Sequence, residues 1–426
     1  MFKKHLIFFI ASAILFNSCK TKTVATQAVT VSPEKHEFKL GIDVLKQSDF
    51  QFLKGKRVGL VTNQTGVDSK LNSTVDILSD NEDVNLVALF APEHGVRGNF
   101  SAGDNVENQV DPKTGIPVFS LYGKTNKPTA EAMDMVDVIV YDLQDIGVRS
   151  YTYISTMGII MEAAAEFDKP VVILDRPNPL GGNRIEGALV TDGFYSFVSR
   201  YKIPYVYGLT CGELALLLNN EGLLKDGKRC NLQVVKMEGW SRGMTFNETG
   251  LQWVPTSPHV PTWQTAFYCA ATGIIGEIDP NLIGIGYTLP FQTLVTQTVN
   301  ANKLAKAMNA LNLDGVIFRP IFFKPYYKNK KGVELQGVQI HITDFKKVTL
   351  TEIQFYFLQE AHKIDPSFDI FLNKEGRYKM FDYGCGSIFL RKALMDSYNF
   401  DSIKKRWNND VESFRAFSKS YYLYDN

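Results

Sequence analysis

Residues 90–98 read FAPEHGVRG and place a carboxyl, an imidazole and a guanidinium directly after an apolar run. Glu93, His94 and Arg97 stand among proline and glycine residues, which are typical of a turn. Glutamate and histidine are among the side chains that most often transfer protons in enzymes. The stretch therefore indicates either a crowded polar turn, with Glu93 paired to Arg97, or part of an active site. His94 either orients Glu93, binds substrate or simply closes the turn.

Polar side chains also follow other apolar runs of the chain. The runs 56–62, 84–90, 137–143 and 171–175 alternate with segments of helical spacing, an order typical of a parallel sheet covered by helices on both faces. Ligands bind beyond the carboxyl ends of the strands in such sheets, so side chains at the strand ends are candidates for one shared site. Besides the three residues above, these are Asn63, Gln64, Asp142, Gln144, Asp145, Arg149, Tyr151, Tyr153, Asp175, Arg176 and Asn178.

The alternation predicts an α/β fold with two domains. Right-handed crossovers between parallel strands make 39–290 a doubly wound, Rossmann-like domain. After residue 290 helical segments mix with strand-like runs in which Pro320 and Pro325 favour either edge positions or irregular strands. We interpret 291–426 as a smaller α+β auxiliary domain. Helical spacing in its last segment predicts one face formed by Ile403, Trp407, Val411 and Phe414.

Residues 1–19 have the layout of an export signal. Two lysines precede an apolar run, 6–16, that is too short to cross a bilayer and leads to Cys19. This order is typical of a bacterial lipoprotein signal, in which Cys19 becomes the lipidated first residue; the alternative is an ordinary cleaved signal with an incidental cysteine. Residues 20–38 are polar and predict a flexible tether. We therefore expect an exported, membrane-anchored lipoprotein, periplasmic or at the outer membrane.

Composition and missing motifs argue against several classes of function. Lys and Arg total 46 against 45 Asp and Glu, so no nucleic-acid partner is expected. No strand is followed by GxGxxG, neither GxSxG nor HExxH occurs, and the six histidines are scattered, so we predict no metal and no cofactor. The cysteines other than Cys19 lack CxxC spacing: Cys211, Cys230, Cys269 and Cys385. Four cysteines allow three disulfide pairings, among which the sequence does not choose, and buried free thiols are the simpler interpretation.

The remaining carboxylates, amides, arginines and aromatic rings suit acid/base chemistry on a glycosidic bond. Glycosidases commonly use two carboxyl groups, one protonated and one ionised. Glu93 is the best candidate for the acid, and Asp142, Asp145 and Asp175 compete for the second role. The alternative for each aspartate is a helix cap or an ion pair with Arg149 or Arg176. The sequence does not choose between inversion and retention. The loop WVPTSPHVPT has three prolines around His259 and predicts a rigid wall, with either a substrate-positioning or a purely structural role.

Seven stretches resemble the bacterial exo-β-N-acetylmuramidases, a family long catalogued as a domain of unknown function. They are GIDVL, LKGKRVGLVTNQTGVD, LFAPEHGVRG, AGDNVENQVDPKTGIPVFSLYG, YDLQDIGVRSYTYISTM, LDRPNPLGG and PTSPHVPT. The resemblance implies a Rossmann-like domain with an auxiliary domain that shapes the pocket, and release of N-acetylmuramic acid from the non-reducing ends of peptidoglycan fragments. It also implies that Glu93 is the active-site glutamate. His259 departs from the family, which commonly has asparagine there.

The implied substrate carries a lactyl carboxylate, which Arg97, Arg149 or Arg176 would hold bidentately. Asn63, Gln64 and Asn178 would bind its acetamido and hydroxyl groups. The remaining predicted substrate-binding residues are Gln144, Tyr151, Tyr153 and His259, and the predicted catalytic residues are Glu93, His94, Asp142 and Asp175.

Two other functions remain open. The same polar cleft would serve a non-catalytic lipoprotein that captures wall fragments for uptake. An amide or ester hydrolase of the wall, using Cys211 or a serine, is favoured least, because no Ser-His or Cys-His neighbourhood occurs.

Overall fold

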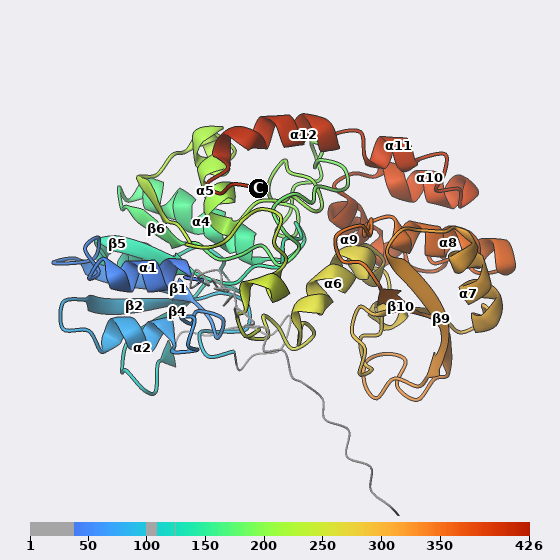
Figure 1. Cartoon of the computed structure of the whole chain (residues 1–426), viewed down its shortest axis with the longest axis horizontal. Coiled ribbons are helices and arrows are strands. Elements are labelled where there is room, and N and C mark those ends of the chain that lie inside the picture. The colour runs from blue at the N-terminus through green and yellow to red at the C-terminus, as the bar shows by residue number, and fades with distance from the viewer. Residues whose placement is uncertain (1–37, 99–108, 124) are drawn as a thin grey trace, which may run out of the picture. The chain divides into compact units, whose positions relative to one another are not determined.

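The computed structural model describes residues 38–98, 109–123 and 125–426. The predicted signal, Cys19 and the tether up to residue 37 lie outside the described residues. The described chain contains a seven-stranded sheet and a three-stranded sheet, both packed against helices (Figure 1). Among the described residues, no helix combines the length and apolar character needed to cross a bilayer.

The larger sheet has the strand order β3-β4-β2-β1-β5-β6-β7. Every neighbouring pair is parallel except β3 and β4. The four strands predicted at 56–62, 84–90, 137–143 and 171–175 are confirmed to within one residue at each end. The strands are β1 (Arg57–Thr62), β2 (Asn85–Ala91), β3 (Gln109–Val110), β4 (Pro117–Ser120), β5 (Val138–Asp142), β6 (Val171–Leu174) and β7 (Leu232–Val235).

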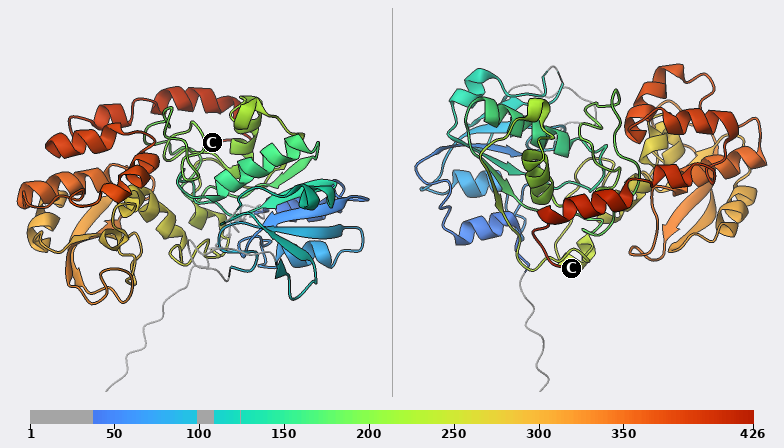
Figure 2. Two further views of the ribbon diagram at one scale, coloured as in Figure 1. Left: turned by 180° about the vertical axis from the view of Figure 1, so that it is seen from behind. Right: turned by 90° about the horizontal axis from the view of Figure 1, so that it is seen from above.

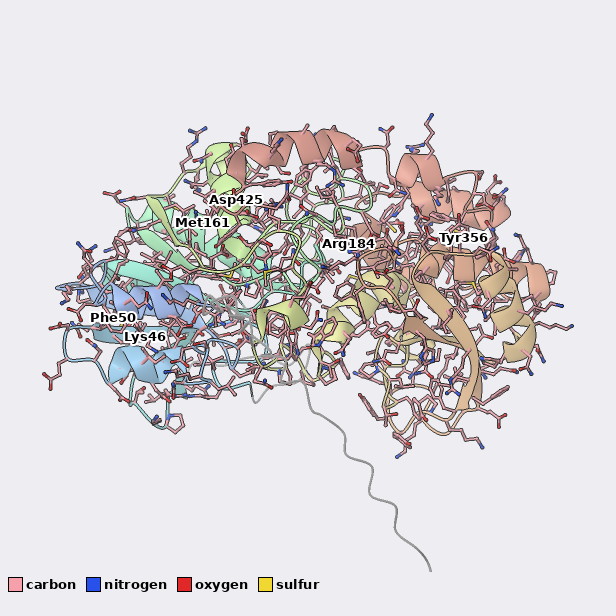
Figure 3. The ribbon with its side chains drawn as sticks, in the orientation of Figure 1. Lys46, Phe50, Met161, Arg184, Tyr356 and Asp425 are labelled. Atoms are coloured by element: carbon pink, nitrogen blue, oxygen red, sulfur yellow. The ribbon has the colours of Figure 1, made fainter. Side chains whose placement is uncertain are left out.

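Helices cover both faces of this sheet (Figure 2). One face packs against α1 (Gly41–Gln47) and α2 (Thr74–Ser79), and the other against α3 (Ala130–Asp134), α4 (Tyr153–Glu166) and α5 (Cys211–Asn220). Successive strand residues point to opposite faces, so Leu60 packs with α1 and Val61 with α4. Phe50 and Met161, labelled in Figure 3, belong to these two separate cores. The predicted doubly wound α/β fold is therefore confirmed.

The strand order reverses at β1. The chain passes from β1 to β2 on one side and later returns to β5 on the other. A crevice forms at such a reversal, beyond the carboxyl ends of the strands, and is the usual ligand site of open α/β sheets. The loops that begin at Asn63, Pro92 and Leu143 all start at this edge.

The smaller sheet is antiparallel and has the order β8-β10-β9. Its strands are β8 (Thr293–Thr296), β9 (Val316–Phe323) and β10 (Leu335–Ile342). Pro320 lies in β9, an edge strand, as predicted. The helices of this part are α6 (Trp263–Gly276), α7 (Ala301–Ala310), α8 (Ile353–Ile364), α9 (Glu375–Cys385) and α10 (Phe389–Ser397). Over the described residues as a whole, four short 3₁₀ helices lie at Lys225–Gly227, Phe246–Thr249, Pro280–Ile283 and Lys419–Tyr421.

The C-terminal segment departs from the prediction of one amphipathic helix. It forms two helices, α11 (Lys404–Trp407) and α12 (Val411–Ser418), so Trp407 and Phe414 do not share one face. Trp407 is buried in the core of the smaller sheet, whereas Phe414 joins the core beside α4 and α5. The chain then returns to the larger sheet (Figure 1). The last residues of the predicted 291–426 domain therefore pack on the first domain.

The four cysteines of the described chain are buried and unpaired, as predicted.

Candidate active site

Glu93 lies in the turn that follows β2 and is partly buried. Its Oε2 accepts a hydrogen bond of 2.7 Å from Thr152 Oγ1, at the N-terminus of α4. Tyr122, two residues after β4, also lies beside this carboxyl, and burial together with Glu93 raises the pKa of the Tyr122 hydroxyl. Three neighbouring elements, β2, β4 and α4, therefore position Glu93.

The turn around His94 has a costly backbone conformation. His94 has a φ of 76°, and Gly95 and Gly98 have φ angles of 77° and 76°. This left-handed conformation costs a non-glycine residue roughly 1–2 kcal/mol, and such strain concentrates at functional sites. A Cβ at residue 98 would lie 2.7 Å from Gln64 Cδ, so a larger residue there would have to displace the Gln64 side chain. His94 itself is only 3% exposed. The protein groups packed around buried His94 therefore stabilise this strained conformation of the turn.

Arg97 pairs with two aspartates. Its Nε and Nη2 lie 2.8 and 2.9 Å from the two carboxyl oxygens of Asp111, and Nη2 lies 3.2 Å from Asp76 Oδ1. The Arg97 guanidinium lowers the pKa of Asp111 to about 2. These contacts connect the Glu93–His94 turn to α2 and to the β3–β4 hairpin. They support a structural role for Arg97 in place of the predicted substrate contact.

Tyr151 and Tyr153, both predicted substrate ligands, hold the proline-rich loop 255–262. The Tyr151 hydroxyl donates to Thr256 Oγ1 at 2.7 Å, and the Tyr153 hydroxyl donates to the Thr256 carbonyl at 2.5 Å. The two rings pack edge to face, with centroids 4.9 Å apart. These tyrosines belong to the first turn of α4 and the loop before it, so they fix the proline-rich loop against the helix that holds Glu93.

Asn63 and Gln64, which follow β1, complete this support. Asn63 Nδ2 donates to the Tyr153 hydroxyl at 2.7 Å, and Asn63 Oδ1 accepts from the backbone and hydroxyl of Thr65 at 2.8 and 2.6 Å. Gln64 Nε2 donates to the Pro255 carbonyl at 2.9 Å. Protein groups therefore occupy both ends of the Asn63 amide, so its predicted contact with a sugar hydroxyl is not supported. Gln64 Oε1 has no hydrogen-bond partner among the described residues, so the predicted role of Gln64 stays a prediction.

His259 connects the proline-rich loop to the smaller sheet. Its Nε2 lies 2.8 Å from the hydroxyl of Tyr327, in the β9–β10 turn, and the two rings are within 11° of parallel. Burial, the positive charge of Lys328 and the nearby His94 lower the pKa of His259. His259 therefore lies near both the Glu93–His94 turn and the β9–β10 turn, and the smaller sheet contributes to the surroundings of the site.

Asp142 does not fit its predicted catalytic role. Its two oxygens lie 2.5 and 2.9 Å from Arg176 Nε and Nη2, and Oδ2 also accepts from Thr74 Oγ1 at 2.5 Å. Arg176 Nη2 additionally donates to the Val67 carbonyl at 2.7 Å. Both side chains are buried, so this pair is structural and neither partner is offered to a substrate.

Asp175 is likewise a structural carboxyl. It is fully buried and accepts hydrogen bonds from Thr210 Oγ1 at 2.7 Å, the Tyr424 hydroxyl at 2.6 Å and the Gly212 backbone at 2.8 Å. Burial raises the pKa of Asp175 to about 6. Its partners come from α5 and from the end of the chain, so it joins elements instead of contacting substrate.

Asp145, the third candidate for the second carboxylate, is also buried. It accepts hydrogen bonds from the Gly147 backbone at 2.6 Å and from the Tyr207 hydroxyl. Burial raises the pKa of Asp145 to about 7. Its Oδ1 has no hydrogen-bond partner within the described part of the chain. Asp145 is therefore a buried carboxyl with a raised pKa, and it is not exposed to a substrate.

Three further predicted ligands bind backbone carbonyls. Arg149 donates to the carbonyls of Ala188, Ile203 and Gly384 at 2.7, 2.7 and 2.9 Å, and burial lowers its pKa to about 10. Gln144 Nε2 donates to the Pro177 and Asp145 carbonyls, both at 2.8 Å, and Asn178 Nδ2 donates to the Leu209 carbonyl at 2.9 Å. The donor groups of these three side chains therefore fix the loops of the site by binding backbone carbonyls.

Sequence reasoning missed three residues around Glu93 and His259: Tyr122, Thr152 and Tyr327. Tyr122 follows PVFS, which forms a strand too short to recognise by periodicity. Thr152 stands between Tyr151 and Tyr153, which the sequence did predict as site residues. Nothing in the local sequence links Tyr327 to a site in the other half of the chain. Over the described ranges, no group of three or more His, Cys, Asp or Glu side chains could hold a metal ion.

Two family models together match nearly all of the described chain. The model described as exo-β-N-acetylmuramidase NamZ, N-terminal, matches residues 58–264, and the model for the C-terminal part of NamZ matches 268–424. The chain belongs to the NamZ family. The resemblance identified from the sequence is thereby confirmed. The two models meet within α6, whose residues already pack in the core of the smaller sheet.

Individual relatives agree with this assignment. The peptidoglycan β-N-acetylmuramidase NamZ of Bacillus subtilis (strain 168) is 38% identical over 422 residues, covering 99% of this chain and all of that protein. Two DUF1343 family proteins from Bacteroides fragilis NCTC 9343 have similar crystal structures. One is 53% identical with a TM-score of 0.87, and the other is 29% identical with a TM-score of 0.73. Each alignment covers 91% of this chain and 99% of the other.

Proposed function

We propose that this protein is an exo-acting glycosidase that releases β-1,4-linked N-acetylmuramic acid from the non-reducing ends of peptidoglycan fragments. Its membership of the NamZ family supports this function, as does the nearly full-length similarity to a peptidoglycan β-N-acetylmuramidase. The observation that carries the proposal is the position of Glu93: a partly buried carboxyl at the strand-order reversal, held by Thr152 and next to Tyr122.

Glu93 acts in this proposal as the general acid. Its proton passes to the glycosidic oxygen as the bond from that oxygen to the anomeric carbon breaks, and water supplies the hydroxyl that the anomeric carbon gains. The other proton of that water is released, and Glu93 takes up a proton again before the next turnover. The Thr152 hydrogen bond fixes the orientation of the carboxyl. The second catalytic group is not assigned to Asp142, Asp145 or Asp175, because all three are buried and hydrogen-bonded to protein groups.

A chromogenic β-N-acetylmuramide and the matching β-N-acetylglucosaminide test this function. The purified protein is expected to release the chromophore from the muramide and far less from the glucosaminide. Calorimetry with a muramic-acid-terminated fragment serves as the companion measurement. Tight binding without release from either substrate, across the mildly acidic and neutral range, would replace the proposed hydrolysis with capture of wall fragments.

We also propose that the protein is exported and anchored through a lipid on Cys19. The basic start, the short apolar run and the polar segment 20–38 support this placement. Multiple acyl chains hold a protein stably on a membrane. Expressed with its own signal, the wild-type protein is expected in the detergent phase after Triton X-114 partitioning, and Cys19→Ser in the aqueous phase. Equal partitioning of the two proteins would contradict the anchor.

A further inference from the structure

The proposed substrate carries a lactyl carboxylate, and the three arginines predicted to bind it are engaged by protein groups. Arg97 pairs with Asp111, and Arg176 pairs with Asp142. Arg149 is buried among backbone carbonyls. A cation that binds the lactyl carboxylate must therefore come from another residue, one that is accessible and lies near the Glu93 turn.

The β9–β10 turn supplies such a cation. Lys328 is exposed and forms no ion pair with any described residue. Two other lysines of this turn are engaged, Lys324 near Glu334 at 3.9 Å and Lys330 near Asp279 at 3.4 Å. Lys328 differs from both because its charge is uncompensated.

The backbone of the turn is held next to His259. The residue before Lys328, Tyr327, makes the 2.8 Å contact with His259 Nε2. Lys328 itself has a φ of 68°, a conformation that non-glycine residues rarely adopt. The Tyr327–His259 contact thus connects the turn to the proline-rich loop.

The β9–β10 turn and the Glu93–His94 turn both act electrostatically on His259. His259 lies within the electrostatic range of both Lys328 and His94, and His94 directly follows Glu93. Burial and these two neighbours lower the pKa of His259, which disfavours the charged form of its imidazole. An ammonium group on a flexible stem binds a carboxylate as a point charge and needs no rigid bidentate geometry.

We propose that Lys328, positioned by the Tyr327–His259 contact, binds the lactyl carboxylate of the terminal sugar and so selects muramic acid over N-acetylglucosamine. This inference rests on the proposed function. It assigns the discrimination to the smaller sheet, whereas Glu93 on the larger sheet performs the chemistry.

The test compares two chromogenic substrates that differ only in charge: the β-N-acetylmuramide with a free lactyl acid, and the same compound as its lactyl methyl ester. The ratio of kcat/KM for acid over ester is measured in the wild type, Lys328→Met and Lys331→Met. Lys331 is the matched control, because it is an exposed lysine of the same turn. The ratio is internal to each protein, so differences in folded fraction cancel.

The wild type is expected to prefer the acid, and Lys328→Met to reduce that preference about fivefold or more, the effect of losing a direct charged contact. Lys331→Met is expected to keep the wild-type ratio. Tyr327→Phe should reduce the ratio by a smaller factor, because Lys328 stays but loses its fixed support.

An unchanged ratio in Lys328→Met, or an equal reduction in Lys331→Met, would overturn the inference while leaving hydrolysis intact. A wild-type protein that cleaves neither compound would overturn the proposed function and this inference with it.

Discussion

Arg176 and Asp142 form a buried ion pair with two hydrogen bonds, joining the carboxyl ends of β5 and β6. The Nε–Oδ1 and Nη2–Oδ2 distances are 2.5 and 2.9 Å, and the two side chains are 4% and 0% exposed. Through Nη2 the arginine also binds the Val67 carbonyl in the loop after β1. The pair therefore fixes three neighbouring loops of the site relative to one another. Because both side chains are buried, it does so without contacting a substrate.

Removing one partner of this pair is expected to destabilise the protein strongly. Arg176→Met leaves the Asp142 carboxylate buried without its counter-ion, which costs about 3–5 kcal/mol of unfolding free energy. The double variant Arg176→Met with Asp142→Asn is expected to recover part of that loss, because no charge stays buried. Urea unfolding measures both. If Arg176→Met were as stable as the wild type but inactive, the result would support substrate binding by Arg176 and contradict the structural role.

Glu93→Gln is expected to lower kcat by about 10²-fold or more, because the amide cannot donate the proton that a general acid supplies. Thr152→Val keeps the carboxyl and removes its 2.7 Å hydrogen bond, so a smaller loss is expected. Steady-state rates on the chromogenic muramide, with circular dichroism to verify folding, distinguish the two variants. Near-normal rates in a folded Glu93→Gln would exclude Glu93 as the acid.

The sequence predicted where polar residues gather but not what each one contacts. Strands with a continuous apolar pattern were recognisable, and the topology rule for parallel sheets then placed Asn63, Glu93 and Gln144 at one edge. Roles could not follow from residue type alone. Arg176 suits a carboxylate ligand whether that ligand is a sugar or Asp142, and only the three-dimensional structure shows which carboxylate is present.

Long-range partners account for the other differences. Asp175 accepts from Tyr424, 249 positions away, and His259 meets Tyr327 in the β9–β10 turn. Hydrophobic periodicity specifies the face of a helix or strand, but it carries no information on which distant loop closes over that face. The split of the predicted last helix into α11 and α12 has the same origin, since Trp407 and Phe414 are buried in two different cores.

Tyr153→Phe is expected to disturb the position of the proline-rich loop. The hydroxyl accepts from Asn63 Nδ2 and donates to the Thr256 carbonyl, so its loss leaves buried polar groups unpaired at a cost of about 1–3 kcal/mol. KM for the muramide should rise more than kcat falls, because the loop is a wall and not a reacting group.

Tyr378→Phe is the matched control for this prediction, since it removes a similar hydrogen bond, 2.8 Å long, from a tyrosine of α9 to the Phe371 carbonyl in the loop before that helix. The control should leave KM unchanged. Equal KM values in Tyr153→Phe and the wild type would show that the loop does not border the sugar.

Asp145 is expected to make stability depend on pH in an unusual direction. Burial raises its pKa to about 7, against about 3.9 in an unfolded chain. Between these values the folded state binds more protons than the unfolded state, so this residue reduces stability as pH rises from about 4 to about 7. Asp145→Asn removes the titrating group. The unfolding free energy of the variant minus that of the wild type should therefore increase by on the order of 1 kcal/mol or more from about pH 5 to about pH 8.

Asp111→Asn provides the opposite case for this experiment. Arg97 lowers the pKa of Asp111 to about 2, so its contribution to stability is complete above about pH 4 and is lost as pH falls through about 2. Its variant should therefore be less stable than the wild type by the same amount at about pH 5 and pH 8. Urea midpoints at both values measure the two differences. Parallel behaviour of Asp145→Asn and Asp111→Asn would show that Asp145 is ionised in the folded protein across this range.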